Sequence, residues 1–343
     1  MTKDVLEMQD NKPHLLYGYE AVARGALEAG VKVVAGFPGT PSTGALEALA
    51  RIADRYDMHV EISTNERVAL EVCWGAASNG QRALCTMNHL GTNVVMDGLK
   101  YSANYGVKGG FVVFIGDDIG ANTSAIESDS RVLADSADIP ILEPSNLSEA
   151  VEMTKYAFDL SEELGLPVVV RSVCQLLMTC SSVNLGAFKA PIKESQFAPN
   201  PKRVVLHEPG VLPAILIHRM LHTSLDKANH LLKKKRYNFI DESDNADFGV
   251  ICSGVAYGLV KNALTRLNRG LPILRLGVVN PIDDDLVVSF ARSVDSLIVL
   301  EEGEPFIEQK VLSALAKHKI CRSVIGRCSN HVPYSGELFI QDY

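Results

Sequence analysis

Nearly continuous apolar runs alternate with helix-like segments along most of this chain, and this alternation limits the possible folds more than any other feature. Such runs are typical of parallel strands, because helices cover both faces of a parallel sheet. In the first half of the chain, the expected strands are residues 31–36, 59–63, 82–87, 110–116, 139–143 and 166–172. The expected helices are residues 19–30, 41–56, 66–78, 91–103 and 147–165. The pattern predicts an α/β domain built on a parallel sheet.

The alternation stops once and then resumes. Residues 190–203 are rich in proline, residues 241–247 are acidic, and a single helix is expected between them, at 211–232. Further strands are then expected at 248–254, 272–277 and 296–302, and further helices at 256–270, 283–294 and 305–317. We therefore expect a polar N-terminal tail (1–16), a first α/β domain (17–182), a connecting region (183–246) and a second, smaller α/β domain (247–343).

The composition excludes several classes of protein. The 343 residues include 47% hydrophobic and 22% charged residues, and the net charge of −8 argues against a nucleic-acid partner. No apolar run reaches the roughly 18 to 20 residues that a membrane span needs. The N-terminus is polar and lacks the apolar core of a signal peptide, so we expect a cytoplasmic location. The seven cysteines form no C-x-x-C pair, which argues against a cluster or zinc site held by this chain alone.

Polar residues follow several of the expected strands, at the edge where open parallel sheets bind ligands. Residues 36–39 form a glycine- and proline-rich turn, after which Thr40 or Ser42 can cap the next helix. Asn88 and His89 follow the strand 82–87, and a long polar loop, 117–129, follows the strand 110–116. The first two features also have an ordinary interpretation: turn and cap chemistry for the turn, and a structural or solvated side chain for the histidine.

Glu66 opens a largely apolar helix directly after a short strand. A carboxylate in an apolar setting is costly unless it is paired or used. One interpretation is structural, because Ser63 and Glu66 have the S-x-x-E spacing of a capping box. The other is catalytic. The chain contains none of the motifs G-x-G-x-x-G, G-x-x-x-x-G-K-[ST], H-E-x-x-H or G-x-S-x-G, so dehydrogenase, P-loop, zincin and α/β-hydrolase functions lose their main support.

Longer segments of the sequence resemble a known family. They include GYEAVARGALEAGVKVVAGFPGTPSTGALEALA, STNERVALEVCWGAA, TMNHLGTNV, GVKGGFVVFIGDD, FGVICSGVAYGLVKNAL and VLEEGEPFIEQKV. In this order, from about Tyr17 to the C-terminus, they resemble the alpha subunits of indolepyruvate:ferredoxin oxidoreductases. These subunits belong to the thiamine-diphosphate-dependent 2-oxoacid:ferredoxin oxidoreductases.

The resemblance implies a role for each half of the chain. Residues 17–182 would form a pyrimidine-binding domain, and residues 247–343 a transketolase C-terminal-like domain. Glu66 would be the family's activating glutamate, which exchanges a proton with N1′ of the cofactor's aminopyrimidine. The other cofactor-binding residues would be Gly39, Thr40, Pro41 and Asn93. The substrate-binding residues would be Thr40, Asn88, His89, Asp117, Asp118 and Arg131. None of the chain's own residues is expected to hold a metal.

The chain also departs from the family. It ends about where the pyrophosphate-binding domain would begin, so we expect that domain, with Mg²⁺, on a partner subunit. Iron–sulfur clusters are expected on a partner of ferredoxin type, within a hetero-oligomer or a dimer of heteromers without a membrane span. Residues 175–178 read QLLM, which is apolar where the family tends to place a histidine. The 117–131 loop keeps Glu127, Asp129 and Arg131 at family-like positions.

Two hypotheses about function follow. In the first, the chain is a subunit of an enzyme that oxidatively decarboxylates an arylpyruvate-like 2-oxoacid to an acyl-CoA. Coenzyme A would be the second substrate, and electrons would reach ferredoxin through partner subunits. In the alternative, the chain is a non-catalytic scaffold or regulatory paralogue that keeps the fold and the subunit interface. The retained Glu66 and Thr40 favour the first hypothesis, and the altered 175–178 segment favours the second.

Overall fold

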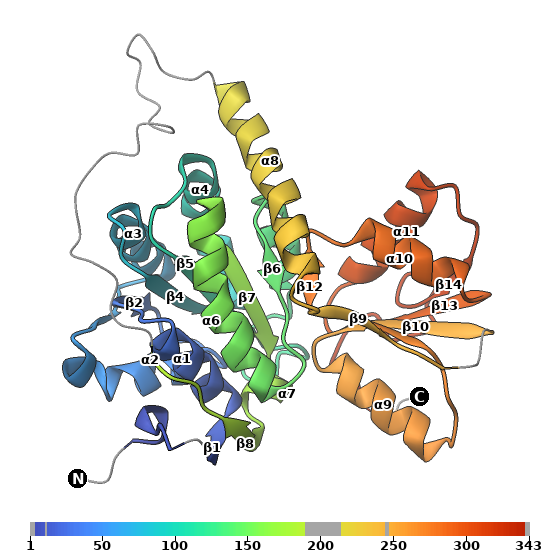
Figure 1. The fold of residues 1–343 in the computed structure, drawn as a ribbon, viewed down its shortest axis with the longest axis horizontal. Coiled ribbons are helices and arrows are strands. Elements are labelled where there is room, and N and C mark those ends of the chain that lie inside the picture. The colour runs from blue at the N-terminus through green and yellow to red at the C-terminus, as the bar shows by residue number, and fades with distance from the viewer. Residues whose placement is uncertain (1–3, 11, 189–213, 244–246, 340–343) are drawn as a thin grey trace.

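The computed structural model describes residues 4–10, 12–188, 214–243 and 247–339, which form two α/β units side by side (Figure 1). The first unit is built on a seven-stranded sheet of order β12-β6-β7-β5-β4-β2-β3. Its strands are β2 (Val33–Gly36), β3 (His59–Ile62), β4 (Ala83–Asn88), β5 (Phe111–Asp117), β6 (Ile141–Leu142), β7 (Val168–Val173) and β12 (Val278–Asn280). The pairs from β6 to β3 are all parallel, as the apolar runs predicted.

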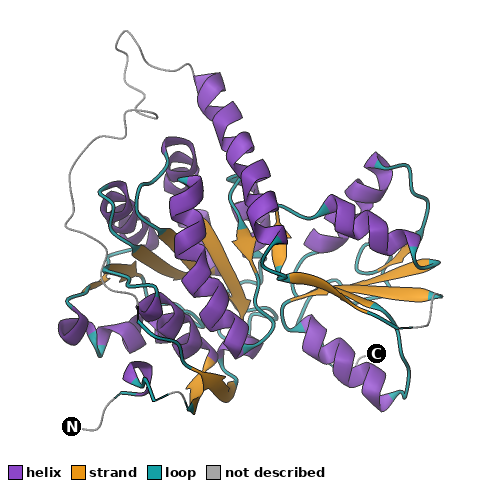
Figure 2. Cartoon of the chain, viewed as in Figure 1, coloured by secondary structure: helices purple, strands orange, loops and turns teal. Residues whose placement is uncertain are grey.

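Helices cover both faces of this sheet (Figure 2). They are α1 (Gly18–Glu28), α2 (Thr43–Ala50), α3 (Glu66–Ser78), α4 (His89–Tyr105), α5 (Ser130–Ser136), α6 (Leu147–Leu164) and α7 (Cys174–Leu177). The core lies between helices and sheet, and every residue of β5 is buried. A two-stranded antiparallel ribbon of β1 (Pro13–Tyr17) and β8 (Cys180–Asn184) joins the two ends of the unit.

The second unit is built on a five-stranded sheet of order β14-β13-β10-β11-β9. Its strands are β9 (Asn238–Asp241), β10 (Phe248–Ser253), β11 (Ile273–Leu276), β13 (Ser296–Leu300) and β14 (Ser323–Ile325), and its helices are α9 (Ala256–Arg266), α10 (Asp284–Arg292) and α11 (Phe306–Lys317). The strands are parallel except for β9, which runs antiparallel to β11 at the edge. The structure therefore confirms the expected α/β class for both halves of the chain.

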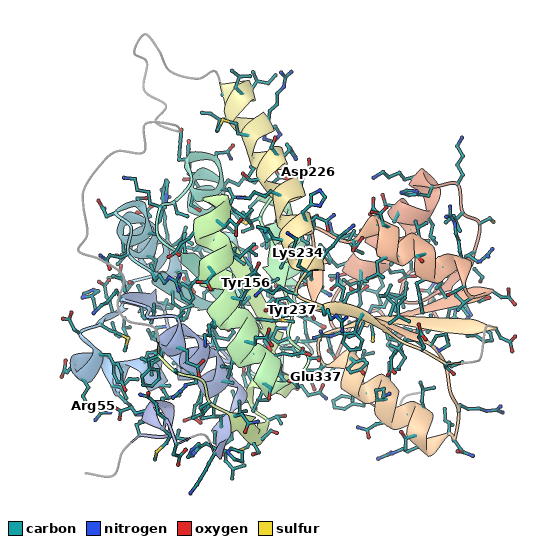
Figure 3. The ribbon with its side chains drawn as sticks, in the orientation of Figure 1. Arg55, Tyr156, Asp226, Lys234, Tyr237 and Glu337 are labelled. Atoms are coloured by element: carbon teal, nitrogen blue, oxygen red, sulfur yellow. The ribbon has the colours of Figure 1, made fainter. Side chains whose placement is uncertain are left out.

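The two units are joined by one strand, β12, and by a packed junction. β12 follows β11 after one residue, yet it pairs antiparallel with β6 of the first sheet. At the same junction, the ring of Tyr156 on α6 meets the ring of Tyr237 edge-on at 6.0 Å, just before β9 (Figure 3). The Tyr237 hydroxyl donates to Glu152, 3.2 Å away. These contacts fix the second unit against the first.

Several elements differ from the prediction. The helix expected over 41–56 ends at Ala50 and is followed by a separate 3₁₀ turn, Ala53–Tyr56. The region expected to connect the domains contains the long helix α8 (Ala214–Lys233), as predicted, but its proline-rich segment 190–203 lies outside the described residues. None of the helices in the described ranges is long and apolar enough to cross a membrane.

Candidate functional site

The polar residues at the strand ends meet along one edge of the first sheet. β3, β2, β4 and β5 are parallel neighbours, so their carboxyl ends point the same way. Glu66 follows β3, the turn 37–42 follows β2, and Asn88 ends β4. The structure therefore places three of the predicted groups at adjacent strand ends.

The first turn of α3 is capped by Asn65. Its side-chain oxygen accepts a hydrogen bond from the Val68 N–H at 3.0 Å. The predicted Ser63–Glu66 capping box is wrong, because α3 begins at Glu66 itself and Glu66 is thus the first helical residue instead of the third. The Ser63 hydroxyl instead donates to the Glu61 carboxylate at 2.8 Å. Capping therefore does not account for Glu66.

Glu66 faces the first turn of α4. A Cβ atom added at Gly91 would lie 2.6 Å from the Glu66 Cγ, so only glycine permits this approach. The Glu66 side chain is half-buried, and within the described part of the chain its carboxylate makes no hydrogen bond or ion pair. Burial, with further contributions from Cys73 and the charge of Glu66, raises the pKa of the nearby Cys85 thiol well above its usual range. The result is a carboxylate at the edge of the core that is held in place but not used by its own chain.

Asn88 connects Glu66 to the turn after β2. Its side-chain oxygen accepts a hydrogen bond from the Gly91 N–H at 3.1 Å. On the other side, a Cβ atom at Gly39 would lie 2.7 Å from the Asn88 amide nitrogen. The backbone of the turn and the side chain of Asn88 are thus in direct contact. Gly39, Asn88, Gly91 and Glu66 form one continuous surface, which we call the Glu66 edge.

The turn after β2 is closed by its own side chains. The Thr43 hydroxyl accepts from the Gly39 N–H at 2.7 Å, and the Ser42 hydroxyl donates back to the Gly39 carbonyl at 2.8 Å. The predicted cap of the next helix by Thr40 or Ser42 is therefore wrong, because Ser42, the N-cap residue, makes no side-chain cap bond. Thr40 is exposed at the tip, whereas Pro41 is buried against Gly116 at the end of β5.

His89 and Asp118 hold the loop that follows β5. Both are fully buried. The His89 Nδ1 accepts from the Asp118 N–H at 3.2 Å, and its Nε2 lies 2.9 Å from the Ile126 carbonyl, to which it donates. Burial alone would raise the pKa of Asp118, but hydrogen bonds led by that from the Thr123 N–H, at 2.8 Å, lower it on balance. Both predicted substrate residues thus make contacts within their own chain.

Asp117 and Arg131 lie in a buried ionic cluster at the junction of the two units. The Asp117 carboxylate accepts from Arg171 at 2.9 Å, and burial raises its pKa, with the charge of Asp129 adding to the effect. The Arg131 guanidinium lies 3.1 Å from the Glu301 carboxylate and donates to the Glu302 carbonyl at 2.6 Å. Asp117 and Arg131 are therefore paired within the protein, away from the Glu66 edge.

The same cluster contains charged residues that the sequence did not single out. Arg171 donates to Glu143 at 2.6 Å, so it joins the ends of β5, β6 and β7. Burial raises the pKa values of Glu301 and Glu302 to about 7 each. The available signal was a charged residue at the end of an otherwise apolar strand, as in IPILE, PVVVRS and LIVLEE. The cluster links the strand ends of the first unit to the loop after β13.

Asn93 lies apart from the Glu66 edge. It is exposed on α4 and lines a cleft of about 470 Å³ between the two units. Glu127, Asp129, Asp135 and Glu304 also line this cleft, so all of its charged lining residues are acidic. The apolar 175–178 segment falls in α7 and the residue after it, where Leu177 packs against Gly116. The structure thus brings together Glu66, Gly39 and Asn88, but not Asn93 or Arg131.

Comparison with known proteins shows which proteins the chain is similar to. Residues 24–173 match the family POR_N, described as "Pyruvate flavodoxin/ferredoxin oxidoreductase, thiamine diP-bdg". Among curated proteins, the chain is 36% identical over 347 residues to the indolepyruvate oxidoreductase subunit IorA of Archaeoglobus fulgidus, covering 98% of this chain and 54% of the relative. It is 37% identical over 305 residues to IorA of Thermococcus kodakarensis, covering 87% and 46%. The chain thus spans about half the length of these relatives.

Two solved structures share the fold at 15% sequence identity. The first is a 2-oxoglutarate:ferredoxin oxidoreductase from Magnetococcus marinus with 2-oxoglutarate, coenzyme A and succinyl-CoA bound, with a TM-score of 0.74 over 93% of this chain and 62% of that one. The second is a split-gene transketolase, an inactive beta4 tetramer, with a TM-score of 0.58 over 91% and 88%. Residues 24–173 are therefore similar to the thiamine-diphosphate-binding domain of pyruvate flavodoxin/ferredoxin oxidoreductases, and the chain as a whole is similar to about half of the indolepyruvate oxidoreductase subunit IorA.

Proposed function

We propose that this chain is a subunit of an oxidoreductase that oxidatively decarboxylates an arylpyruvate-like 2-oxoacid, such as indolepyruvate, to an acyl-CoA. Electrons would pass to ferredoxin through partner subunits, and we place the complex in the cytoplasm. The observation that carries the proposal is the Glu66 carboxylate, which is held at the carboxyl edge of the sheet without a partner in the described chain. A purely structural glutamate at this position would be expected to bond to its own chain.

The Glu66 edge fits the pyrimidine half of thiamine diphosphate. An aminopyrimidine ring is flat and presents nitrogen atoms on its rim, so it suits a carboxylate beside a surface without bulky side chains. Gly39 and Gly91 supply that surface, because a Cβ at either position would collide with Asn88 or Glu66. Within the described part of the chain, the four residues of the Glu66 edge include no lysine or arginine, so we place the diphosphate and its Mg²⁺ on a partner subunit.

The chain's own residues would position the cofactor and move one proton. A Glu66 carboxyl oxygen would exchange a proton with N1′ of the pyrimidine, and Gly91 would fix the side chain for that exchange. Gly39, Thr40 and Pro41 would border the ring, and Asn88 would hold the turn in place. When bound, thiamine diphosphate supplies the group that accepts the electron pair released by decarboxylation. General acid–base assistance of this kind typically contributes about 10²- to 10⁴-fold.

We also propose a location for the substrate. A 2-oxoacid is an anion, and the charged residues that line the cleft beside Asn93 are all acidic, so this cleft is unfavourable for it. Asp117 and Arg131 are committed to the buried cluster, and His89 and Asp118 to the loop after β5. The exposed hydroxyl of Thr40, at the tip of the turn, therefore remains the best-placed predicted substrate contact on this chain.

A partner subunit would dock at the Glu66 edge. Large apolar side chains are exposed on the elements that border it: Phe37 after β2, Ile62 at the end of β3, and Val68 in the first turn of α3. Exposed apolar residues beside a polar site are typical of interaction surfaces. The partner proposed here carries the pyrophosphate-binding domain, and a further subunit or domain carries iron–sulfur clusters.

The alternative is a scaffold or regulatory paralogue without thiamine chemistry. It is favoured by the apolar 175–178 segment, whose Leu177 packs against Gly116 instead of offering a polar group. One experiment separates the two functions. The chain is combined with the partner subunits that carry the pyrophosphate-binding domain and the iron–sulfur clusters, with thiamine diphosphate and Mg²⁺, and reduction of ferredoxin is measured with indolepyruvate and coenzyme A. The proposed enzyme reduces ferredoxin only when all components are present, whereas a scaffold forms the complex but gives no reduction with any 2-oxoacid.

A further inference from the structure

A group of metal-ligating side chains lies far along the chain from the Glu66 edge. His218 and His222 are one helical turn apart on α8, and Asp138 lies in the connection between α5 and β6. One ligand atom from each of the three residues lies within 4.8 Å of the others. Within the described residues, this is the group of histidine, cysteine and acidic side chains placed closely enough to hold an ion. We propose that Asp138, His218 and His222 bind a divalent transition-metal ion, Zn²⁺, which fastens α8 to the first unit.

The two histidines already have the spacing that a bound ion requires. Their Nε2 atoms are 3.0 Å apart, and their rings are nearly perpendicular, at 88°. Zinc–nitrogen bonds are about 2.0 to 2.1 Å long, so two nitrogens bound at 90° to 110° lie about 2.9 to 3.4 Å from each other. Residues four apart share one face of a helix, which is the arrangement that zinc sites on helices use. The pair can therefore take up an ion without a change in α8.

Asp138 supplies a ligand of opposite charge from a different element. Its backbone has a φ of 56° in a short turn, a conformation that aspartate and asparagine tolerate better than most residues. Its carboxylate oxygen lies within 4.8 Å of the histidine nitrogens, so a rotation of the side chain would bring it to bonding distance of an ion that they share. The fourth position would remain for water, as is common where three protein ligands hold zinc.

The site would control where α8 lies. This helix packs its apolar face, including Ile217 and Leu221, against α4 and α6. His218 and His222 follow these residues directly and are exposed. A metal bridge to Asp138 would add a polar link beside the apolar contact and hold α8 along the first unit (Figure 1). The sequence did not indicate this site, because Asp138 comes 80 positions before His218 and only the fold brings it to the two histidines.

Zinc titration by calorimetry on the tag-free chain tests the proposal. The wild type and His230→Ala should bind one Zn²⁺ equally well, since His230 lies on the same helix but outside the group. His218→Ala and His222→Ala should each weaken binding at least about 100-fold, beyond the 10- to 100-fold typical of losing a metal's outer-shell partner. Asp138→Asn keeps the turn conformation and should weaken binding about 10-fold or more. Co²⁺ should give visible absorption bands in the wild type that disappear in both histidine variants.

Hydrogen exchange tests the bridge separately from the binding. Zinc should slow exchange of the amides of α8 in the wild type but not in Asp138→Asn. All four side chains lie at the surface, so circular dichroism should show each variant folded. Zinc binding that survives the loss of both histidines refutes the site. Binding that is unaffected by Asp138→Asn, with exchange of α8 unchanged by zinc, refutes the bridge.

Discussion

Replacing Arg171 with methionine should destabilise the protein strongly and in a pH-dependent way. The Arg171 side chain is fully buried, donates to Asp117 at 2.9 Å and to Glu143 at 2.6 Å, and joins three strand ends of the first sheet. Methionine keeps much of the length but removes the charge, which leaves two buried carboxylates without their main cation. Breaking a buried ion pair in this way costs about 3 to 5 kcal/mol.

The sign of the pH effect follows from Asp117. Burial already raises its pKa, and loss of Arg171 removes the charge that opposes this effect. The folded variant should therefore bind protons more readily than the unfolded chain. Its stability deficit should be largest at about pH 8 and shrink toward about pH 5.5, as the carboxylates take up protons. A loss of about 3 to 5 kcal/mol corresponds to a fall in melting temperature of roughly 5 to 10 °C for a chain of this size.

Urea unfolding, followed by circular dichroism at several pH values, measures the loss of stability and its dependence on pH. Arg67→Met is the matched control, because Arg67 pairs with Glu71 and Asp97 at the surface with 54% of its side chain exposed. Exposed pairs are worth roughly 0 to 1 kcal/mol, so this variant should stay close to the wild type at every pH. If Arg171→Met matched Arg67→Met at high pH, the buried cluster would not depend on Arg171 and the reasoning would fail.

Three further predictions test other parts of the structure. Gly91→Ala should displace Glu66, which should lower turnover of the assembled complex and cost about 1 to 3 kcal/mol in the free energy of unfolding, measured by denaturation. Gly75→Ala on α3 is the control: nothing lies within 4 Å of an added Cβ there, so this variant should be neutral or stabilising. Asn65→Ala should lower the free energy of unfolding by about 1 kcal/mol, because the helix cap is lost, and Ser63→Ala should lower it less. If thermal melts showed the larger loss for Ser63→Ala, Ser63 and not Asn65 would be the cap. Burial raises the pKa of Glu302 to about 7, so the free energy of unfolding should fall as the pH rises from about 5 to 7. Glu302→Gln keeps an acceptor for the Leu338 N–H and should flatten this pH dependence in urea titrations. An unchanged pH dependence would exclude the Glu302 carboxyl as its source.

The sequence predicted the fold class because local periodicity carries that information. Apolar runs and helix-like segments marked most of the strands and helices of both units, and the parallel pairs from β6 to β3 followed from them. Strand pairing between distant segments has no local signal. β12 joins the first sheet although its sequence belongs with the second unit, and β1 pairs with β8 across the whole first unit. The antiparallel edge strand β9 was missed for the same reason.

The site was predictable where strand ends determine it. Glu66, Gly39 and Asn88 follow adjacent parallel strands, so the pattern alone indicated that they meet. The cap was mispredicted because the S-x-x-E spacing cannot tell whether the N-cap lies two residues later, at Asn65. Arg131 was expected at the substrate, but its partners Glu301 and Glu302 come from the other half of the chain, and only the packing of the two units reveals them.

The central claim concerns the Glu66 carboxylate, and the most direct test is proton exchange at C2 of thiamine diphosphate in the assembled complex. Glu66→Gln keeps the shape of the side chain beside Gly91 but removes the carboxyl group that we propose exchanges a proton with N1′. We predict that this variant assembles with its partner and binds the cofactor nearly as well as the wild type. Its C2 exchange and its turnover should fall by about 10²- to 10⁴-fold. Exchange and turnover equal to those of the wild type would contradict the account and leave Glu66 without a catalytic role.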